Sequence, residues 1–241
     1  MKQFLTLAAT LFAAAQILGQ ASNVANLGDK LDQIGNNSSV QVIPVFDKTV
    51  YEIEGSRYSA QDFNEGEIWM TEERHFTTQL KYRFDELENS VEVKYPEGRT
   101  LMLFNNQVEK CFIKLPDGRQ LRYINASDFL AEKDLNRLLQ VVYTSPKYKL
   151  IKNPKKEFKN GSREKTYRAA GTQNDAFIAA HTYFLQIEKG KFKEIKLTKK
   201  GFLKALPELK TKLDALFLTP QYAKELDDWK AAELLQSIEK Q

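Results

Sequence analysis

Apolar and polar residues alternate through most of residues 79–124. Four successive runs place apolar side chains at alternate positions, namely Val91, Val93 and Tyr95, then Leu101 and Leu103, then Cys111, Ile113 and Leu115, then Leu121 and Tyr123. A side-chain period of two predicts strands with one buried face and one solvated face. Because the runs follow one another closely, we expect an antiparallel meander.

Two tetrapeptides of the same chemistry separate these runs: Tyr95-Pro96-Glu97-Gly98 and Leu115-Pro116-Asp117-Gly118. Proline presets φ for the second position of a turn, and glycine accepts the positive φ with which the chain re-enters a strand. Both are therefore predicted to be tight turns. Further strands are predicted at Val40–Phe46 (an edge strand because of Pro44), Glu67–Glu73, Leu138–Tyr143 and Tyr148–Lys152.

The remaining connections differ in composition. Ser127–Asn136 is predicted to hold a short helix, and the polar, basic segment Asn153–Asn174 is predicted to be a long mobile loop. Thr182–Glu188 and Phe192–Leu197 should form a hairpin about Lys189-Gly190, with glycine supplying a positive φ.

The C-terminal residues carry helix signals. Thr198 is predicted to cap a helix that runs to Leu206, Pro207 to open the next, and Thr219-Pro220 to open the last. The last helix should present an apolar stripe of Tyr222, Leu226, Trp229, Ala232, Leu235 and Ile238. Strands followed by helices indicate an α+β protein: an antiparallel β-meander sheet, then a hairpin and C-terminal helices.

The first residues resemble an export signal. A short positive start, the apolar stretch Phe4–Leu18 and small residues at Gly19 and Ala21 predict a secretory signal peptide over residues 1–21, with a buried N-terminal helix as the alternative. We expect a flexible lead-in at 22–39 and one α+β domain at 40–241, strand-rich over 66–152 and with the hairpin and helices at 180–241. No later stretch is apolar enough to cross a bilayer, so we expect an exported protein, periplasmic or secreted.

Charge is distributed unevenly. Residues 21–145 carry a net charge of −6, whereas residues 146–241 carry +9, and Lys147–Lys212 holds 18 basic against 6 acidic residues with aromatic residues interleaved. Such a segment suits an anionic lipid or an acidic polysaccharide, although lysines on a strand edge also prevent aggregation. Nucleic acid is not expected as a partner of an exported protein. The candidate binding residues are Lys155, Lys156, Lys159, Arg163, Lys165 and Arg168.

Signatures of catalysis are weak. The single cysteine, Cys111, lies on the apolar side of its strand and is expected to be a buried thiol. Glu73 and His75 supply at most one pair of the three or four ligands that zinc needs, and phosphate-binding glycine loops are absent. The sequence therefore predicts no catalytic residue, metal or cofactor.

Two alternatives remain open. A hydrolase could use carboxylates that lack a local motif, and the candidates for such a pair are Glu72, Glu73, Asp85, Glu86 and Glu88. A structural partner of an outer-membrane complex would instead expose an apolar patch of several hundred Å². The sequence does not predict the oligomeric state.

Several stretches resemble a known group of proteins. These are the region of Trp69, Leu80–Asp85, Val108–Ile113, Arg122–Asn125, Tyr148–Lys152, Tyr183–Leu185 and Lys199–Leu203. Together they are similar to the strand pattern of exported, uncharacterised proteins of Bacteroidota-type bacteria. The resemblance implies the exported compartment and no particular activity. The leading hypothesis is a non-enzymatic envelope protein that acts as a binding or accessory module.

Overall fold

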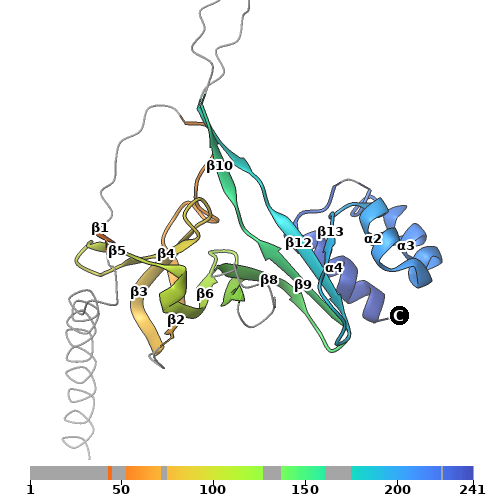
Figure 1. Ribbon diagram of the computed structural model, residues 1–241, viewed down its shortest axis with the longest axis horizontal. Coiled ribbons are helices and arrows are strands. Elements are labelled where there is room, and N and C mark those ends of the chain that lie inside the picture. The colour runs from red at the N-terminus through yellow and green to blue at the C-terminus, as the bar shows by residue number, and fades with distance from the viewer. Residues whose placement is uncertain are drawn as a thin grey trace, which may run out of the picture.

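The computed structural model describes residues 53–71, 75–126, 137–160, 175–223 and 225–240, together with the backbone of 43–44. Within them, eleven strands form one antiparallel sheet in the order β1-β5-β4-β3-β2-β6-β7-β8-β9-β12-β13, and β10 and β11 form a separate ribbon. Three helices follow at the C-terminal end (Figure 1). The chain is therefore an α+β protein, as its sequence predicts.

The elements have the following bounds. The strands are β1 (Ile43–Pro44), β2 (Asn64–Met70), β3 (His75–Asp85), β4 (Ser90–Lys94), β5 (Thr100–Leu103), β6 (Val108–Lys114), β7 (Gln120–Asn125), β8 (Leu138–Thr144), β9 (Tyr148–Asn153), β10 (Lys156–Lys159), β11 (Ala176–Ala179), β12 (Thr182–Ile187) and β13 (Lys193–Ile195). The helices are η1 (Asn105–Gln107), α2 (Lys199–Ala205), η3 (Pro207–Leu209), α3 (Lys210–Phe217) and α4 (Asp228–Glu239).

The first part of the sheet curls on itself. Strands β2 to β5 form a meander, and the chain then returns to pair β6 with β2. In a flat sheet β5 and β6 would lie about 19 Å apart, at ~4.8 Å per strand. The connection through η1 spans only roughly 13 Å. Accordingly, the rings of Phe84 on β3 and Tyr123 on β7 stack at 4.0 Å although two strands lie between them.

A side chain bridges the opening of this curled sheet. Asn89, in the turn between β3 and β4, has a positive φ of 53°, which asparagine adopts more readily than most residues. Its amide oxygen accepts from the Leu138 N–H at 2.8 Å, and its amide nitrogen donates to the Leu138 carbonyl at 3.0 Å. The side chain thus links the start of β4 to the start of β8. Buried residues of β2 to β8 fill the interior.

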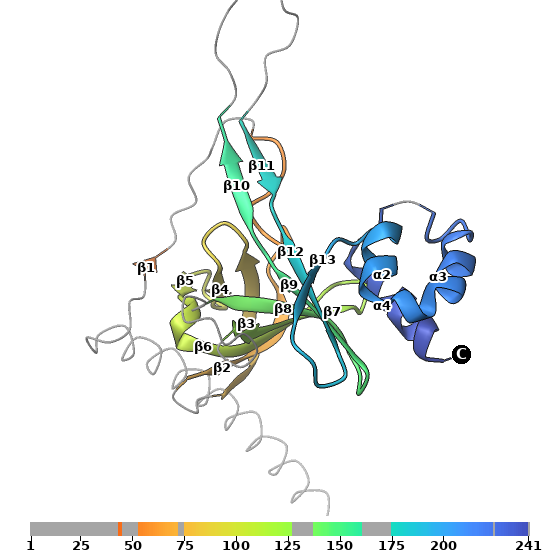
Figure 2. The ribbon, with the colours of Figure 1, turned by 45° about the vertical axis from the view of Figure 1, so that its right-hand side comes forward.

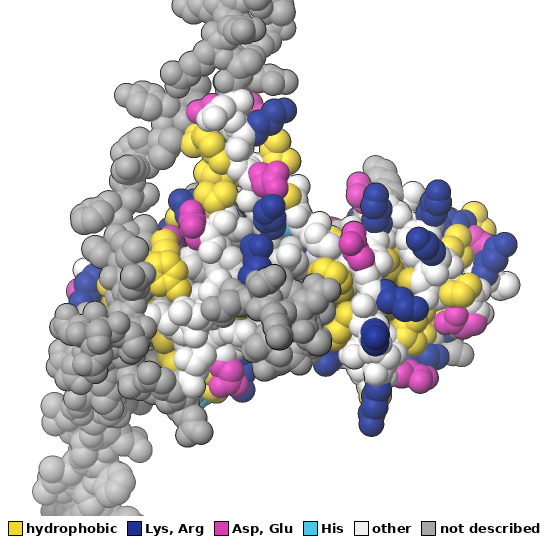
Figure 3. Space-filling model, viewed as in Figure 1, with side chains coloured by type: hydrophobic (Ala, Val, Ile, Leu, Met, Phe, Trp, Pro, Cys, Tyr) yellow, Lys and Arg dark blue, Asp and Glu magenta, His cyan; other side chains and the backbone are white. Residues whose placement is uncertain are grey.

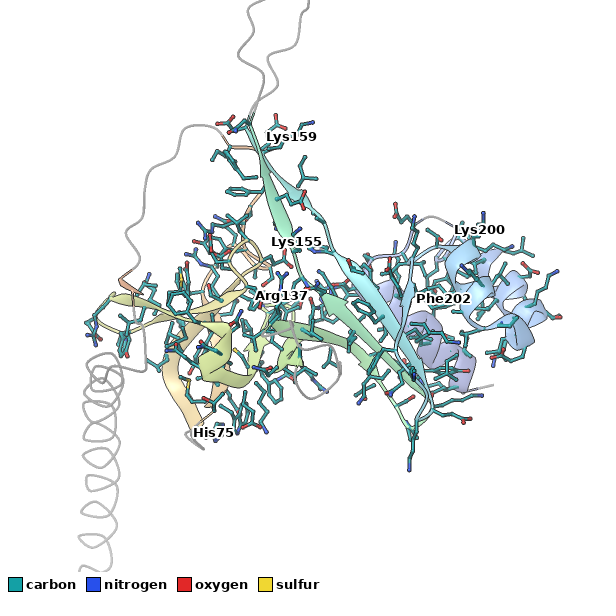
Figure 4. The ribbon with its side chains drawn as sticks, in the orientation of Figure 1. His75, Arg137, Lys155, Lys159, Lys200 and Phe202 are labelled. Atoms are coloured by element: carbon teal, nitrogen blue, oxygen red, sulfur yellow. The ribbon has the colours of Figure 1, made fainter. Side chains whose placement is uncertain are left out.

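The second part of the sheet carries the helices. Strands β8, β9, β12 and β13 continue from the curled sheet, and α2, α3 and α4 pack on them around a second apolar cluster. Phe202 of α2 is fully buried in this cluster (Figure 4). The ribbon of β10 and β11 continues the β9–β12 pair away from the rest of the molecule, as Figure 2 shows.

The predicted meander and turns are confirmed. Gly98 and Gly118 have φ values of 94° and 84°, and each donates its N–H to the residue that opens its turn. The alternating apolar positions of β4 to β7 are buried, apart from the partly buried Leu115. Cys111 is fully buried, and burial raises the pKa of its thiol.

Three predictions about connections are wrong. The expected loop 153–174 contains β10, which pairs with β11; the alternation rule misses this strand because the ribbon has solvent on both faces. The positive φ of the β12–β13 turn is at Glu188 (φ 53°) rather than at Gly190. The last helix begins at Asp228, because the Asp227 carboxylate caps it by accepting from the Lys230 N–H at 2.8 Å.

Some predictions concern residues that are not described. The signal peptide (1–21), the lead-in (22–39), most of Val40–Phe46, residues 72–74 and the helix expected at Ser127–Asn136 lie outside the described residues. The edge position of Pro44 is confirmed, since β1 pairs only with β5 at the end of the sheet. Among the described helices, none has the length and apolar character needed to cross a bilayer.

Candidate functional site

The structure describes three of the six basic residues proposed for binding, and they lie along the ribbon (Figure 4). Lys156 points inward: its Nζ lies 3.2 Å from Glu86 Oε2 and donates to the carbonyls of Ser56 and Tyr58. Lys155 is exposed and pairs with Glu157 Oε1 at 2.7 Å.

Lys159, on the outer part of the ribbon, is exposed and has no ion-pair partner among the described residues. Arg163, Lys165 and Arg168 lie outside the described residues. In the described part of the ribbon, therefore, only Lys159 combines exposure with an unpaired ammonium group.

The inward-pointing lysines belong to a buried ion network between the two apolar clusters. Lys152 and Tyr183 are cross-strand partners on β9 and β12, so their side chains share the face that α4 covers. Asp228, in the first turn of α4, accepts from Lys152 Nζ at 3.1 Å and from Tyr183 Oη at 2.7 Å. Lys152 Nζ also lies 3.5 Å from Glu86 Oε1. The carboxylates of Glu86 and Asp228 therefore neutralise Lys152 and Lys156.

His181 completes this network. The Lys155 N–H donates to His181 Nδ1 at 3.1 Å, so the neutral ring carries its proton on Nε2, which lies 4.0 Å from Glu86 Oε2. Burial, and then the charge of Lys152, lowers the pKa of His181. Burial, reinforced by Asp228, raises the pKa of Tyr183, which stays protonated. The network holds charges in pairs and connects the helices to the curled sheet.

The described carboxylates among those considered for hydrolysis, Asp85, Glu86 and Glu88, lie in ion pairs. Asp85 is fully buried and forms an ion pair with Arg57, while its Oδ1 accepts from the N–H groups of Leu87 and Glu88 at 2.9 and 3.1 Å. Glu86 is occupied by the two lysines. Neither carboxylate lines the groove of about 580 Å³ that opens beside α4. The described residues thus give the hydrolase alternative no support.

His75 lies at the exposed start of β3. Its ring stacks on Trp69 at 4.0 Å, and its Nε2 lies 3.4 Å from Glu67 Oε2. The proposed neighbours Glu72 and Glu73 are not described. Across the described ranges, no group of three or more His, Cys, Asp and Glu side chains could hold a metal ion.

Unpaired positive charge gathers on the C-terminal part of the molecule. We define the lysine-rich lobe as the surface formed by the β12–β13 turn, β13, α2 and the start of α3. Seven exposed lysines of this lobe have no ion-pair partner among the described residues: Lys189, Lys191, Lys193, Lys196, Lys200, Lys204 and Lys210. Figure 3 shows many basic side chains over this lobe, with acidic ones interspersed.

Local sequence fixes this lobe. The Thr198 hydroxyl caps α2 by accepting from the Gly201 N–H at 3.2 Å. A side chain at Gly201 would place its Cβ 2.1 Å from the Lys196 carbonyl oxygen, so glycine is required for α2 to lie against the end of β13. The buried Phe202 anchors the inner face of α2. Lys200 and Lys204, four residues apart, then share the outer face.

A sequence signal for this lobe exists. Between Lys189 and Lys204 there are seven lysines and one acidic residue, Glu194. The spacing of the lysines resembles the polar face of an ordinary strand and helix, so the sequence favours the preceding basic segment as the binding candidate. Only the structure shows that the ribbon lysines are largely paired and those of the lobe largely are not.

Comparisons with family models, curated proteins and solved structures find no match to this chain. The exposed large apolar side chains among the described residues are Phe158, Ile178 and Leu218. Phe158 faces Phe177 across the ribbon, whereas Ile178 is opposite Glu157, so Phe158 and Ile178 lie on different faces and form no single patch.

Proposed function

We propose that this chain is an exported, non-enzymatic accessory protein of the cell envelope that binds anionic lipid through the lysine-rich lobe. The observation that carries the proposal is the set of seven exposed lysines that have no ion-pair partner in the part of the chain that the structure describes. The export signal expected at residues 1–21 supports the compartment. The curled sheet serves as the scaffold, and the ion network holds the helices to it.

The energetics favour a lipid surface. A lysine near an anionic membrane contributes about 1 kcal/mol at physiological salt. Seven such residues suffice for stable attachment even if only some reach the surface at once. The ammonium group is a compact point charge that suits a phosphate headgroup. Leu218, at the end of α3, is 82% exposed and could enter the interfacial region.

A polysaccharide is less well matched to the lobe. Sugar rings stack on exposed aromatic faces, which provide a large apolar surface with fixed geometry. Phe192, in the β12–β13 turn, is partly buried because it packs against a small apolar cluster, and Phe202, Phe217 and Tyr222 of the helices and the turn after α3 are buried. The lobe therefore offers charge without a stacking platform, which fits a headgroup layer better than a sugar chain.

Vesicle co-sedimentation tests the proposal. The chain should bind vesicles of phosphatidylglycerol and phosphatidylcholine more tightly than vesicles of phosphatidylcholine alone, and binding should weaken as salt rises. The triple variant K196E/K200E/K204E should bind at least roughly a hundredfold more weakly, because three favourable charges become unfavourable. The variant K114E/K155E/K159E has the same net charge and should retain binding.

Other results would contradict the proposal. Equal losses in both triple variants would mean that net charge alone governs binding. Retention of an acidic polysaccharide together with indifference to phosphatidylglycerol would reassign the ligand. Recovery of the native protein from cytosolic fractions with residues 1–21 intact would refute export.

A further inference from the structure

A groove opens where β7 and β8 separate. Its volume is about 580 Å³, and it is lined by Lys114 of β6, Gln120 and Arg122 of β7, residues 141–144 of β8 and Trp229 of α4. β7 and β8 pair only from Tyr123↔Gln140 to Asn125↔Leu138. Beyond that point β8 stays paired with β9, and the register of this pairing shifts between Val141 and Tyr143. The groove is therefore a split in the sheet, closed on one side by α4.

Among the described residues, the split leaves the facing edges of β7 and β8 without a partner strand. The Ala126 N–H donates to the Arg137 carbonyl at 2.7 Å, in register with the β7–β8 pairing. Hydrogen-bonded positions recur at every second residue of an antiparallel pair. The peptide groups of Arg122 and Gln120 therefore face β8, past the point where the pairing ends. An open edge of this kind pairs readily with an extended peptide.

The groove is positively charged. Lys114 and Arg122 are exposed, and none of the described residues that line the groove is a carboxylate. Arg122 Nε donates to Gln120 Oε1 at 2.9 Å, which orients the guanidinium without neutralising it. Lys114 has no ion-pair partner among the described residues. An occupant that complements these groups carries negative charge.

The tryptophan favours a peptide over a sugar chain. The Arg119 guanidinium lies 4.4 Å from the centroid of the Trp229 ring, so one face of the indole is already covered. Trp229 also packs against the apolar cluster of the curled sheet. The Trp229 indole therefore has little free surface on which a pyranose ring could stack, whereas the strand edge remains open.

We propose that this groove binds an extended acidic segment of a partner protein. The segment adds a strand at the edge of β7, and its carboxylates meet Lys114 and Arg122. The four residues of β8 from Val141 to Thr144 span about 13 Å, the length of roughly four residues of extended chain. This site is independent of the lysine-rich lobe and of lipid binding.

Calorimetry with short peptides tests the proposal. The probe is an acetylated, amidated hexapeptide of alternating Glu and Thr, compared with the same peptide carrying Lys in place of Glu. Two further peptides carry the acidic sequence with the N–H groups of alternate residues methylated, one peptide for each of the two possible registers. In the Trp69→Phe variant, Trp229 is the only tryptophan, and its fluorescence should respond to the acidic peptide.

We expect the acidic peptide to bind, the basic peptide not to bind, and methylation in one register to weaken binding at least about tenfold. The variant K114E/R122E should reverse the preference between the acidic and basic peptides, while K196E/K200E should bind as the unaltered protein does. Equal binding of both methylated peptides would overturn strand pairing. Binding of tetragalacturonate in place of the peptide, or no binding by any peptide at millimolar concentration, would overturn the proposal.

Discussion

Lys152 and Lys156 lie inside the junction between the curled sheet and the helices, whereas Lys196, Lys200 and Lys204 lie on the surface of the lysine-rich lobe. The first two contact Glu86, and Lys152 also contacts Asp228. The other three have no ion-pair partner among the described residues. One basic stretch of sequence therefore supplies both the connection between two halves of the fold and the surface available to a ligand.

The buried lysines and the exposed lysines have different roles, the first in stability and the second in binding. A buried lysine is tolerated only when carboxylates and hydrogen bonds compensate for its lost hydration. Its charge is therefore satisfied and contributes little attraction to an external anion. An exposed lysine is solvated and costs the fold almost nothing, so its charge remains available. Variants of the first group should change unfolding, and variants of the second should change binding.

The largest expected effect is that of Glu86→Leu. This change leaves Lys152 with only Asp228 and removes the carboxylate partner of Lys156, and breaking a buried pair from one side costs about 3–5 kcal/mol. Urea unfolding should show a loss of this order. Lys200→Met in the lobe should change the free energy of unfolding by less than about 0.5 kcal/mol.

A smaller loss in the free energy of unfolding for Glu86→Gln than for Glu86→Leu would support the role of Glu86 as the partner of the buried lysines. Glutamine keeps polar partners for the lysines while removing one charge. An equal loss in Glu86→Gln and Glu86→Leu would show that the charge itself provides the stability. No loss in Glu86→Leu would show that the network does not connect the two halves.

The network also shows where sequence reasoning ends. Val91, Cys111 and Tyr123 could be assigned to the core because alternation is a local signal of one-sided burial. The curl of the sheet depends on β6 pairing with β2, a partner choice that no local pattern encodes. The contact between Glu86 and Lys156 depends on this curl, so the sequence could not reveal that Lys156 is unavailable for binding.

Other errors have local causes. Phe158 and Ile178 lie on a ribbon with solvent on both faces, which removes the apolar alternation that marks a half-buried strand. At the last helix, Thr219 carries the sequence signal of a cap, but its hydroxyl donates to the Leu216 carbonyl at 2.7 Å. Asp227, eight positions later, performs the capping. Both residue types favour the N-cap position, so the sequence alone does not distinguish between them.

The second prediction compares two neighbours on the ribbon. Lys156→Met removes an ammonium group that contacts Glu86 and two backbone carbonyls, so we expect a loss of about 2 kcal/mol in the free energy of unfolding. Lys155→Met breaks only an exposed pair with Glu157 and should cost less than about 0.5 kcal/mol. Chemical unfolding of both variants gives the difference directly. Equal losses would refute the distinction between paired interior and exposed lysines.

The smallest predicted effect is a dependence of stability on pH through His181. Because folding lowers the pKa of this imidazole below its usual 6.5, the unfolded chain takes up a proton more readily than the native protein does. The contribution of His181 to the free energy of unfolding is therefore complete above about pH 6.5. It decreases as the pH drops towards the native pKa, by at most about 1.4 kcal/mol per pH unit. The groups that face the ring are Lys152, Lys156, Glu86 and Asp228.

His181→Asn keeps an acceptor for the Lys155 N–H but cannot be protonated. It should therefore remove the contribution of His181 to the slope of the free energy of unfolding against pH between pH 5.0 and 7.5. Urea unfolding of both proteins across that range measures the difference, and His75→Asn, at the exposed start of β3, controls for the loss of an imidazole elsewhere. A slope that persists in His181→Asn would place the pH dependence outside the network. Lipid binding by the lobe should not depend on the protonation of His181, because the ring lies in the ion network with Lys152 and Lys156 and not in the lobe.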